Sequence, residues 1–143
     1  MSEFNAALGL LQLEGIDEAI ARRREVHARY RKALAEVPGI TVVDSGNPDH
    51  HNFSYCPILV EPPYTLSRDA LYERLKLHGI NTRRYFYPLL SNLPMYRRQP
   101  SAAPERLPVA TWASAHVLCL PIFPDLLPAD QARVSDAIRS FRR

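Results

Sequence analysis

The residues best suited to bind a charged ligand are gathered in one short stretch of the chain. That stretch contains Asn81, Thr82, Arg83, Arg84, Tyr85, Phe86, Tyr87 and Pro88. Successive side chains of a strand point to opposite faces, so we expect Arg84 and Phe86 on one side. Arg83, Tyr85 and Tyr87 would then share the other side. A guanidinium beside two phenol rings suits an anionic or sugar ligand, because arginine offers forked donors and aromatic faces stack on sugars. The candidate substrate-binding residues are Arg83, Arg84, Tyr85 and Tyr87.

The same stretch also has a plainer interpretation. It would be an edge strand whose polar face is only solvated and whose tyrosines fill the rim of the core. Elsewhere, the sequence shows no arrangement of residues that is typical of a catalytic site. The five histidines lack the spacing of a metal site, the five glycines form no phosphate-binding loop, and both cysteines lie in apolar runs. We therefore assign no catalytic residue and no metal ligand.

Lysine is scarce, which matters for any enzyme that forms a Schiff base. Lys32 and Lys76 are the only lysines among 18 basic residues. Both fall within amphipathic helical patterns, so we expect them on the surface.

Composition places the chain among compact, single-domain proteins. It has 143 residues, of which 46% are apolar, and a net charge of +3. No apolar run approaches the roughly 20 residues of a membrane helix, and the N-terminus does not resemble a secretory signal. Cys56 and Cys119 are isolated from each other, which favours a reduced, cytoplasmic protein. The small positive charge is weak evidence for a nucleic-acid partner, and we expect none.

Periodicity predicts alternating helices and strands that would position the candidate residues. A long helix is expected over residues 2–37, with a bend near Gly15. Further helices are expected over residues 67–79, over residues 107–116 and from residue 128 onward. Strands are expected over residues 40–43, 52–60, 80–86 and 117–120. This order predicts an α+β domain covering residues 1–143, with helices packed on a small, mixed or mostly antiparallel sheet.

Three stretches of the sequence carry a family resemblance. They are residues 1–14 (MSEFNAALGLLQLE), residues 79–89 (GINTRRYFYPL) and residues 117–124 (VLCLPIFP). Together and in this order they resemble the DegT/DnrJ/EryC1/StrS aminotransferases, which are fold-type-I enzymes that use pyridoxal phosphate (PLP). The resemblance extends through nearly the whole chain and is to the C-terminal small domain of those enzymes.

The resemblance implies a function for the complete enzyme. Members of the family transfer an amino group, from glutamate in the expected case, to a nucleotide-linked keto-sugar, and they act as homodimers. Their larger N-terminal domain carries the Schiff-base lysine and most cofactor contacts, so we expect this chain alone to bind no PLP and to be inactive. The resemblance places the strand that contains Arg84 and Tyr87 at the mouth of the active site. Many relatives have histidine where this chain has Leu90, which removes one expected sugar contact.

Two other functions are compatible with the sequence. The chain could be a binding or dimerisation module without catalysis, paired through the apolar face of its first helix. Phe4, Leu8 and Leu11 would then be covered by a symmetric partner, whereas their exposure would indicate a missing domain. The arginines of the first helix could instead bind nucleic acid, which would make affinity depend steeply on salt.

Overall fold

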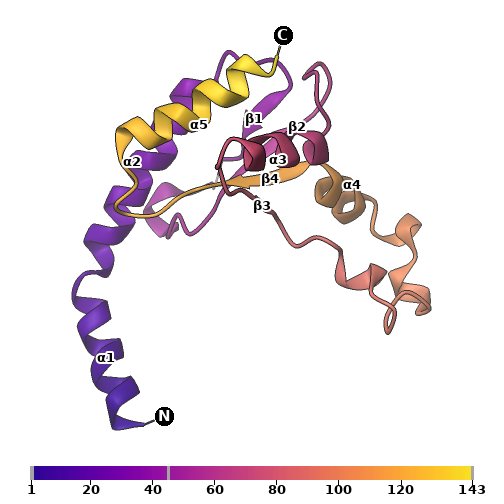
Figure 1. Cartoon of the computed structure of the whole chain (residues 1–143). Helices are drawn as coiled ribbons and strands as arrows, with labels where there is room; N and C mark the ends of the chain where they lie inside the picture. Colours follow the sequence, from indigo (N-terminus) through magenta and orange to yellow (C-terminus); the bar gives the residue numbers. More distant parts are fainter. Residues whose placement is uncertain (1, 45, 143) are drawn as a thin grey trace.

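The N-terminal region consists of two consecutive helices. The computed structural model describes residues 2–44 and 46–142. Helix α1 (Glu3–Glu14) and helix α2 (Ile16–Leu34) are separated at Gly15 (Figure 1). Ser2 caps α1, because its hydroxyl accepts a hydrogen bond from the Asn5 amide. The bend predicted near Gly15 is therefore confirmed as a break between two helices.

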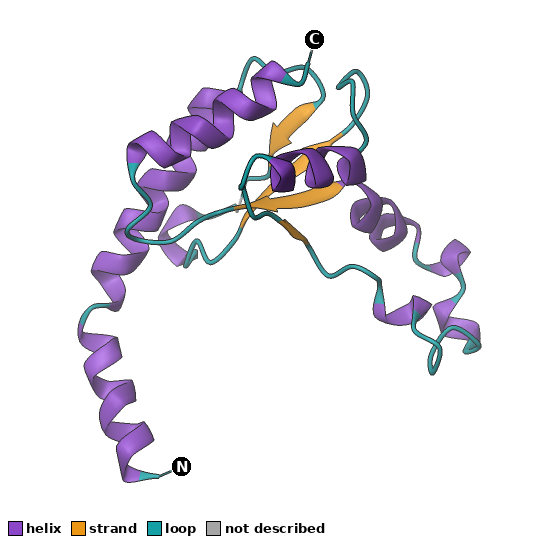
Figure 2. Cartoon of the chain, in the orientation of Figure 1, coloured by secondary structure: helices purple, strands orange, loops and turns teal. Residues whose placement is uncertain are grey.

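Within the described part of the chain, four short strands form one antiparallel sheet (Figure 2). They are β1 (Ile40–Val42), β2 (Cys56–Val60), β3 (Arg83–Arg84) and β4 (Val117–Leu120), and their order in the sheet is β1-β2-β4-β3. The strand predicted over residues 117–120 is confirmed, and the one predicted over residues 40–43 ends one residue earlier. The strands predicted over residues 52–60 and 80–86 are too long.

Local hydrogen bonds explain why β2 and β3 are shorter than predicted. Phe53 has a φ angle of 50°, and its amide donates to Nδ1 of His51, so the chain turns before β2 begins. The amide of Ile80 donates to the Leu75 carbonyl and thereby completes the end of the preceding helix. Side-chain and capping bonds of this kind compete with strand pairing.

Three further helices follow the predicted pattern. They are α3 (Arg68–Leu77), α4 (Pro108–His116) and α5 (Pro128–Ser140). Ser67 caps α3 by accepting a hydrogen bond from the Ala70 amide. Single turns of 3-10 helix occur at η1 (Pro48–His50), η2 (Leu90–Asn92), η3 (Pro100–Ala102) and η4 (Pro104–Arg106).

The core lies between one face of the sheet and the helices α2, α3 and α5. Alternate residues of β2 are buried, and Ile58 pairs with Leu118 of β4 on that face. Helices α2 and α5 lie side by side over it, with α3 next to α5 (Figure 1). The main helical contributors to this core are Val26, Tyr30 and Leu34 of α2, Leu71 and Leu75 of α3, and Val134 and Ile138 of α5. The predicted α+β class is confirmed.

A tight turn at Gly39 joins α2 to the sheet. Gly39 has a φ angle of 77°, and its carbonyl accepts a hydrogen bond from the Glu61 amide. A Cβ atom at this position would collide with the Glu61 carbonyl oxygen and lie 2.7 Å from the Cβ of Tyr64. The close approach therefore requires glycine.

Two segments extend from the same side of the core, as Figure 1 shows: α1 and the chain from residue 86 to residue 107. No residue of α1 is buried. Its exposed apolar side chains are Phe4, Leu8, Leu10, Leu11 and Leu13, and Phe4 is 76% exposed. Within the described residues, no helix combines the length and apolar character needed to cross a membrane.

Candidate functional site

Strand β3 directs its two arginines to opposite faces of the sheet. Arg84 pairs with Leu118, whose side chain belongs to the core face, and therefore points toward α3. Arg83 pairs with Cys119 and points to the other face. Both arginines lie at an edge of the sheet, since β3 is the last strand in its order.

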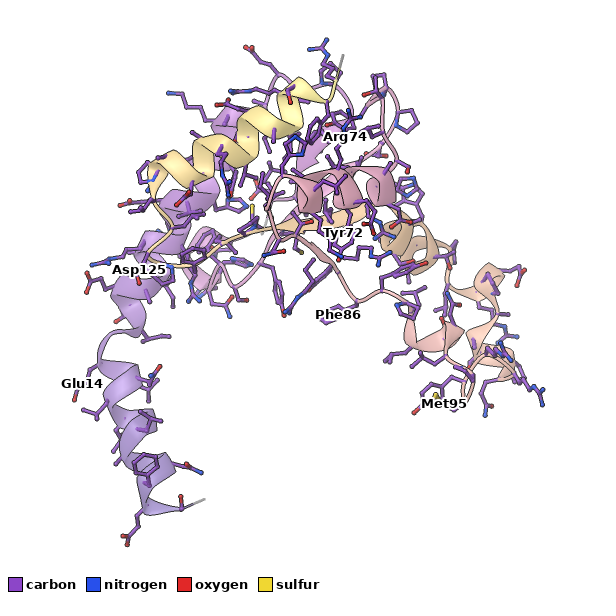
Figure 3. All side chains as sticks on the ribbon, viewed as in Figure 1. Glu14, Tyr72, Arg74, Phe86, Met95 and Asp125 are labelled. Carbon is purple, nitrogen blue, oxygen red and sulfur yellow. The ribbon has the colours of Figure 1, made fainter. Side chains whose placement is uncertain are left out.

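Arg84 belongs to a cluster that also includes residues of α3. Its Nη1 atom lies 3.3 Å from Oδ1 of Asp69. Its guanidinium carbon is 4.6 Å from the ring centre of Tyr72 and 5.0 Å from that of Tyr87. Figure 3 shows Tyr72 on the side of α3 that faces the sheet. Arg84 is thus held among two rings and a carboxylate, with its side chain still 34% exposed.

A second guanidinium, from Arg68, completes this cluster. Its Nη1 atom donates to the Val117 carbonyl at 3.0 Å, and its Nε lies 2.9 Å from Oδ1 of Asp69 without the alignment of a hydrogen bond. Its guanidinium carbon is 4.9 Å from the ring centre of Tyr87. We call Arg68, Asp69, Tyr72, Arg84 and Tyr87 the arginine–tyrosine cluster. Sequence reasoning identified Arg84 and Tyr87 but missed the three residues of α3.

On the opposite face, three aromatic rings pack together. The ring centre of Tyr85 is 5.1 Å from that of Tyr55 and 4.3 Å from that of Phe86. Tyr55 immediately precedes β2, so this contact joins segments 30 residues apart in the sequence. Figure 3 shows Phe86 projecting from the chain after β3.

The predicted alternation of side chains is wrong after Tyr85. Phe86 packs with Tyr85, and Tyr87 lies with Arg84 rather than with Arg83 and Tyr85. The physical reason is the backbone at Phe86, whose φ angle of 45° interrupts the extended conformation that alternation requires. The segment therefore distributes its rings between both faces of the sheet edge.

Arg83 lines a cavity of about 590 Å³ beside the start of α5. The cavity is also lined by Tyr55, which precedes β2, by Cys119 of β4, and by Asp130 and Arg133 of α5. It therefore presents two guanidinium groups and one carboxylate to a polar ligand.

A second, apolar cavity of about 770 Å³ lies along the chain that follows β3. Its lining residues are Phe86, Tyr87, Pro88, Leu89, Leu90, Ser91, Leu107 and Ala110. Leu90 is 72% exposed and gives this cavity an apolar side chain at the position where a sugar-contacting histidine is expected from the family resemblance. Tyr87 borders both this cavity and the arginine–tyrosine cluster.

The two lysines of the chain lie away from the candidate site. Lys32 is exposed on α2 and lines a separate cavity with Glu36 and Arg142, while Lys76 is exposed on α3. Neither lysine lines the cavity that contains Arg83 or the one that contains Tyr87. Residues 2–44 and 46–142 also contain no group of three His, Cys, Asp or Glu side chains that could hold a metal ion.

The cysteines are buried, which makes them poorly suited to act as nucleophiles. Burial raises the pKa of Cys56 to about 12 and that of Cys119 to about 11. Both thiols are therefore protonated at neutral pH, and both are buried.

The fold matches that of solved sugar aminotransferases. The enzyme DesI, crystallised in the presence of its TDP-sugar product, superimposes with a TM-score of 0.82 at 35% identity, over 99% of this chain and 36% of DesI. DesV of S. venezuelae, in complex with a ketimine intermediate, superimposes with a TM-score of 0.83 at 31% identity, over 96% of this chain and 36% of DesV. The sugar aminotransferase CalS13 from Micromonospora echinospora shares the same architecture, with a TM-score of 0.74 at 27% identity over 94% of this chain and 34% of CalS13. The class of protein with this fold is thus the sugar aminotransferases.

Sequence comparison identifies the family. The model of the DegT/DnrJ/EryC1/StrS aminotransferase family matches residues 1–139, and this chain belongs to that family. The dTDP-4-amino-4,6-dideoxy-D-glucose transaminase of Escherichia coli is 47% identical over 126 residues, which are 88% of this chain and 34% of the relative. The enzyme of the same name from Shigella dysenteriae is 40% identical over the same proportions. The chain thus spans about a third of the length of these relatives.

Proposed function

We propose that this chain is the small domain of a nucleotide-sugar aminotransferase and supplies one wall of its substrate site. The observation that carries the proposal is the 47% identity to a dTDP-sugar transaminase over 126 residues. A second observation supports it: guanidinium groups and tyrosine rings lie together at one edge of the sheet, beside two cavities.

The substrate class follows from the relatives and from the chemistry of this edge. The names of both relatives indicate a dTDP-linked 4-amino-4,6-dideoxy sugar, so the acceptor would be the corresponding 4-keto-6-deoxy sugar. Arg84 is suited to its diphosphate, because guanidinium groups bind phosphate through forked hydrogen bonds. Arg83 points to the other face of the sheet and is suited to a different polar group of the substrate. The rings of Tyr85 and Tyr87 are each suited to stacking on a sugar, and Tyr87 is the one that lies on the same face as Arg84. The apolar side chain of Leu90 is compatible with a sugar that lacks the 6-hydroxyl group.

The complete enzyme would use PLP and take its amino group from glutamate. PLP carries the amino group from donor to acceptor, while the protein binds and orients both. The Schiff-base lysine would come from a larger domain, because neither lysine of this chain lines the candidate site. The complete enzyme would be a cytoplasmic homodimer, and the isolated chain would have no transaminase activity.

A hybrid enzyme tests this proposal. The part of the E. coli relative that precedes its matching region would be fused to this chain, and product formation would be followed by mass spectrometry. We expect the hybrid to convert a dTDP-linked 4-keto-6-deoxy sugar to its 4-amino form with PLP and glutamate, and the isolated chain to form none. A hybrid that shows the absorption band of bound PLP but forms no product would contradict the proposal. So would a half-reaction with glutamate by the isolated chain.

Helix α1 supports an alternative function. Its exposed apolar residues, including Phe4 and Leu11, are the kind of surface that another protein element covers. A module without catalysis could pair with a second copy through this helix and still bind a sugar nucleotide. Sedimentation of the isolated chain distinguishes the two functions: a dimer that dissociates on Leu11→Glu favours the module, whereas a monomer favours a missing domain.

A further inference from the structure

Arg68 is a buried cation in an electrostatically unfavourable position. It is 2% exposed and is the first residue of α3. The N-terminus of a helix carries a partial positive charge, so a cation there gains nothing from the helix dipole. Removing a guanidinium from water is also costly unless its partners compensate. An apolar side chain could fill the same space without these costs. The contacts of Arg68 must therefore explain why an arginine occupies this position.

The contacts of Arg68 converge on Tyr87 and its surroundings. Its hydrogen bond to the Val117 carbonyl fixes the guanidinium against the junction between α4 and β4. From that position its carbon lies 4.9 Å from the ring centre of Tyr87. Tyr87 is itself 49% exposed, so Arg68 contacts a residue that remains about half open to solvent and to a ligand.

Asp69 links Arg68 to the other guanidinium near the same ring. One oxygen of Asp69 lies 2.9 Å from Nε of Arg68 and 3.3 Å from Nη1 of Arg84. Arg84 in turn lies over Tyr87 at 5.0 Å. Removing Arg68 would leave Asp69 paired with Arg84 alone and would remove one of two cations from the Tyr87 ring. Arg68 therefore influences both neighbouring candidate residues although it lines neither of the two cavities next to β3.

We propose that Arg68 is a positioning residue that holds the Tyr87 ring and the Arg84 guanidinium in the orientation that binds the substrate. The substrate part of this inference rests on the proposed function. The positioning part concerns the arrangement within the chain and can be measured without a ligand.

Three variants of the 143-residue chain separate positioning from folding. Arg68→Met keeps most of the volume and removes the charge, while Arg68→Lys keeps the charge but loses the planar group. Arg74→Met is the matched control, because Arg74 also lies on α3 and its guanidinium carbon is 5.0 Å from the ring centre of Phe141. Figure 3 shows Arg74 and Tyr72 on opposite sides of α3. The control therefore removes a similar contact away from the arginine–tyrosine cluster.

Two measurements are made on each variant. The first is the NMR spectrum of ¹³C-labelled tyrosine rings, with the Tyr87 signals assigned from Tyr87→Phe. The signals of Tyr30 serve as an internal reference, since this residue is fully buried on α2 and its hydroxyl donates to the Pro121 carbonyl. The second is the dissociation constant for dTDP-4-amino-4,6-dideoxy-D-glucose, measured by calorimetry.

We expect Arg68→Met to shift the Tyr87 signals, leave those of Tyr30 in place and weaken binding about tenfold. Arg68→Lys should restore part of the affinity, and Arg74→Met should change neither measurement. If Arg68→Met does not fold, the two measurements on Arg68→Lys decide the test. Unchanged Tyr87 signals in a folded Arg68 variant would overturn the positioning role, as would shifted signals with unchanged affinity. Failure of the unsubstituted chain to bind would count against substrate binding by the isolated domain, and the Tyr87 signals would still decide whether Arg68 positions the ring.

Discussion

Replacing Arg84 by methionine separates ligand binding from stability at the candidate site. In the folded chain the substitution removes a partly exposed ion pair with Asp69 and two ring contacts, with Tyr72 and Tyr87. A partly exposed ion pair contributes roughly 0.2–1 kcal/mol. A cation over an aromatic ring contributes about 0.5–1 kcal/mol at an exposed site. Because methionine retains some packing, we expect the free energy of unfolding to fall by only about 1–2 kcal/mol.

The effect on a bound diphosphate should be larger. A hydrogen bond to a charged group contributes about 1.5–3 kcal/mol, so loss of one such bond weakens binding about tenfold to a hundredfold. Calorimetric titration with dTDP-4-amino-4,6-dideoxy-D-glucose measures the affinity, and urea denaturation measures the stability.

The matched control is Arg31→Met, which causes the same change in net charge. Arg31 pairs with Asp44 at 3.1 Å on an exposed part of the surface and lines neither of the cavities next to β3. We expect this variant to bind the nucleotide sugar normally. If Arg84→Met unfolds more readily but binds with unchanged affinity, Arg84 is a structural residue and the substrate-binding assignment is refuted.

Three further substitutions or conditions test the fold. Gly39→Ala should lower the free energy of unfolding in urea by about 2–4 kcal/mol, because it combines a strained φ angle with overpacking. Burial lowers the pKa of His27 in the folded chain. As the pH falls below about 6.5, its imidazole is therefore protonated in the unfolded chain at a higher pH than in the folded chain. Stability should therefore decline below that pH, and His27→Gln should flatten the decline in urea titrations at different pH values. Cys56 and Cys119 should react with dithionitrobenzoate at pH 8 only after urea unfolds the chain, because burial raises both thiol pKa values.

The elements that sequence predicts well are those with local signals. Gly15 interrupts a helical pattern and separates α1 from α2, and Ser67 precedes α3 and caps it. Both effects depend on residues within one helical turn. Periodicity and capping residues therefore contain enough information to locate these boundaries.

The arrangement of the candidate site depends on contacts between distant segments, and sequence predicts it less well. The positive φ angle at Phe86 is unfavourable for a residue with a side chain, so no local preference predicts it. It coincides with the packing of Phe86 and Tyr85 beside Tyr55. Arg68 was missed because an arginine near a helix start is usually solvated. The sequence feature that could have identified Arg68 is the placement of a cation at the N-terminus of a helix, where the helix dipole disfavours positive charge.

The order of the strands limits how copies of this chain can associate. The two edge strands, β1 and β3, contain three and two residues, and β3 consists of two arginines. Both edges are short and offer few free backbone groups, and the arginines of β3 repel their own copies, which discourages the strand addition that leads to aggregates. Chains that meet in concentrated solution should therefore associate through the apolar side chains of α1. Such contacts are reversible and sensitive to a single introduced charge, so solubility of the isolated chain can be engineered at α1 without altering the sheet.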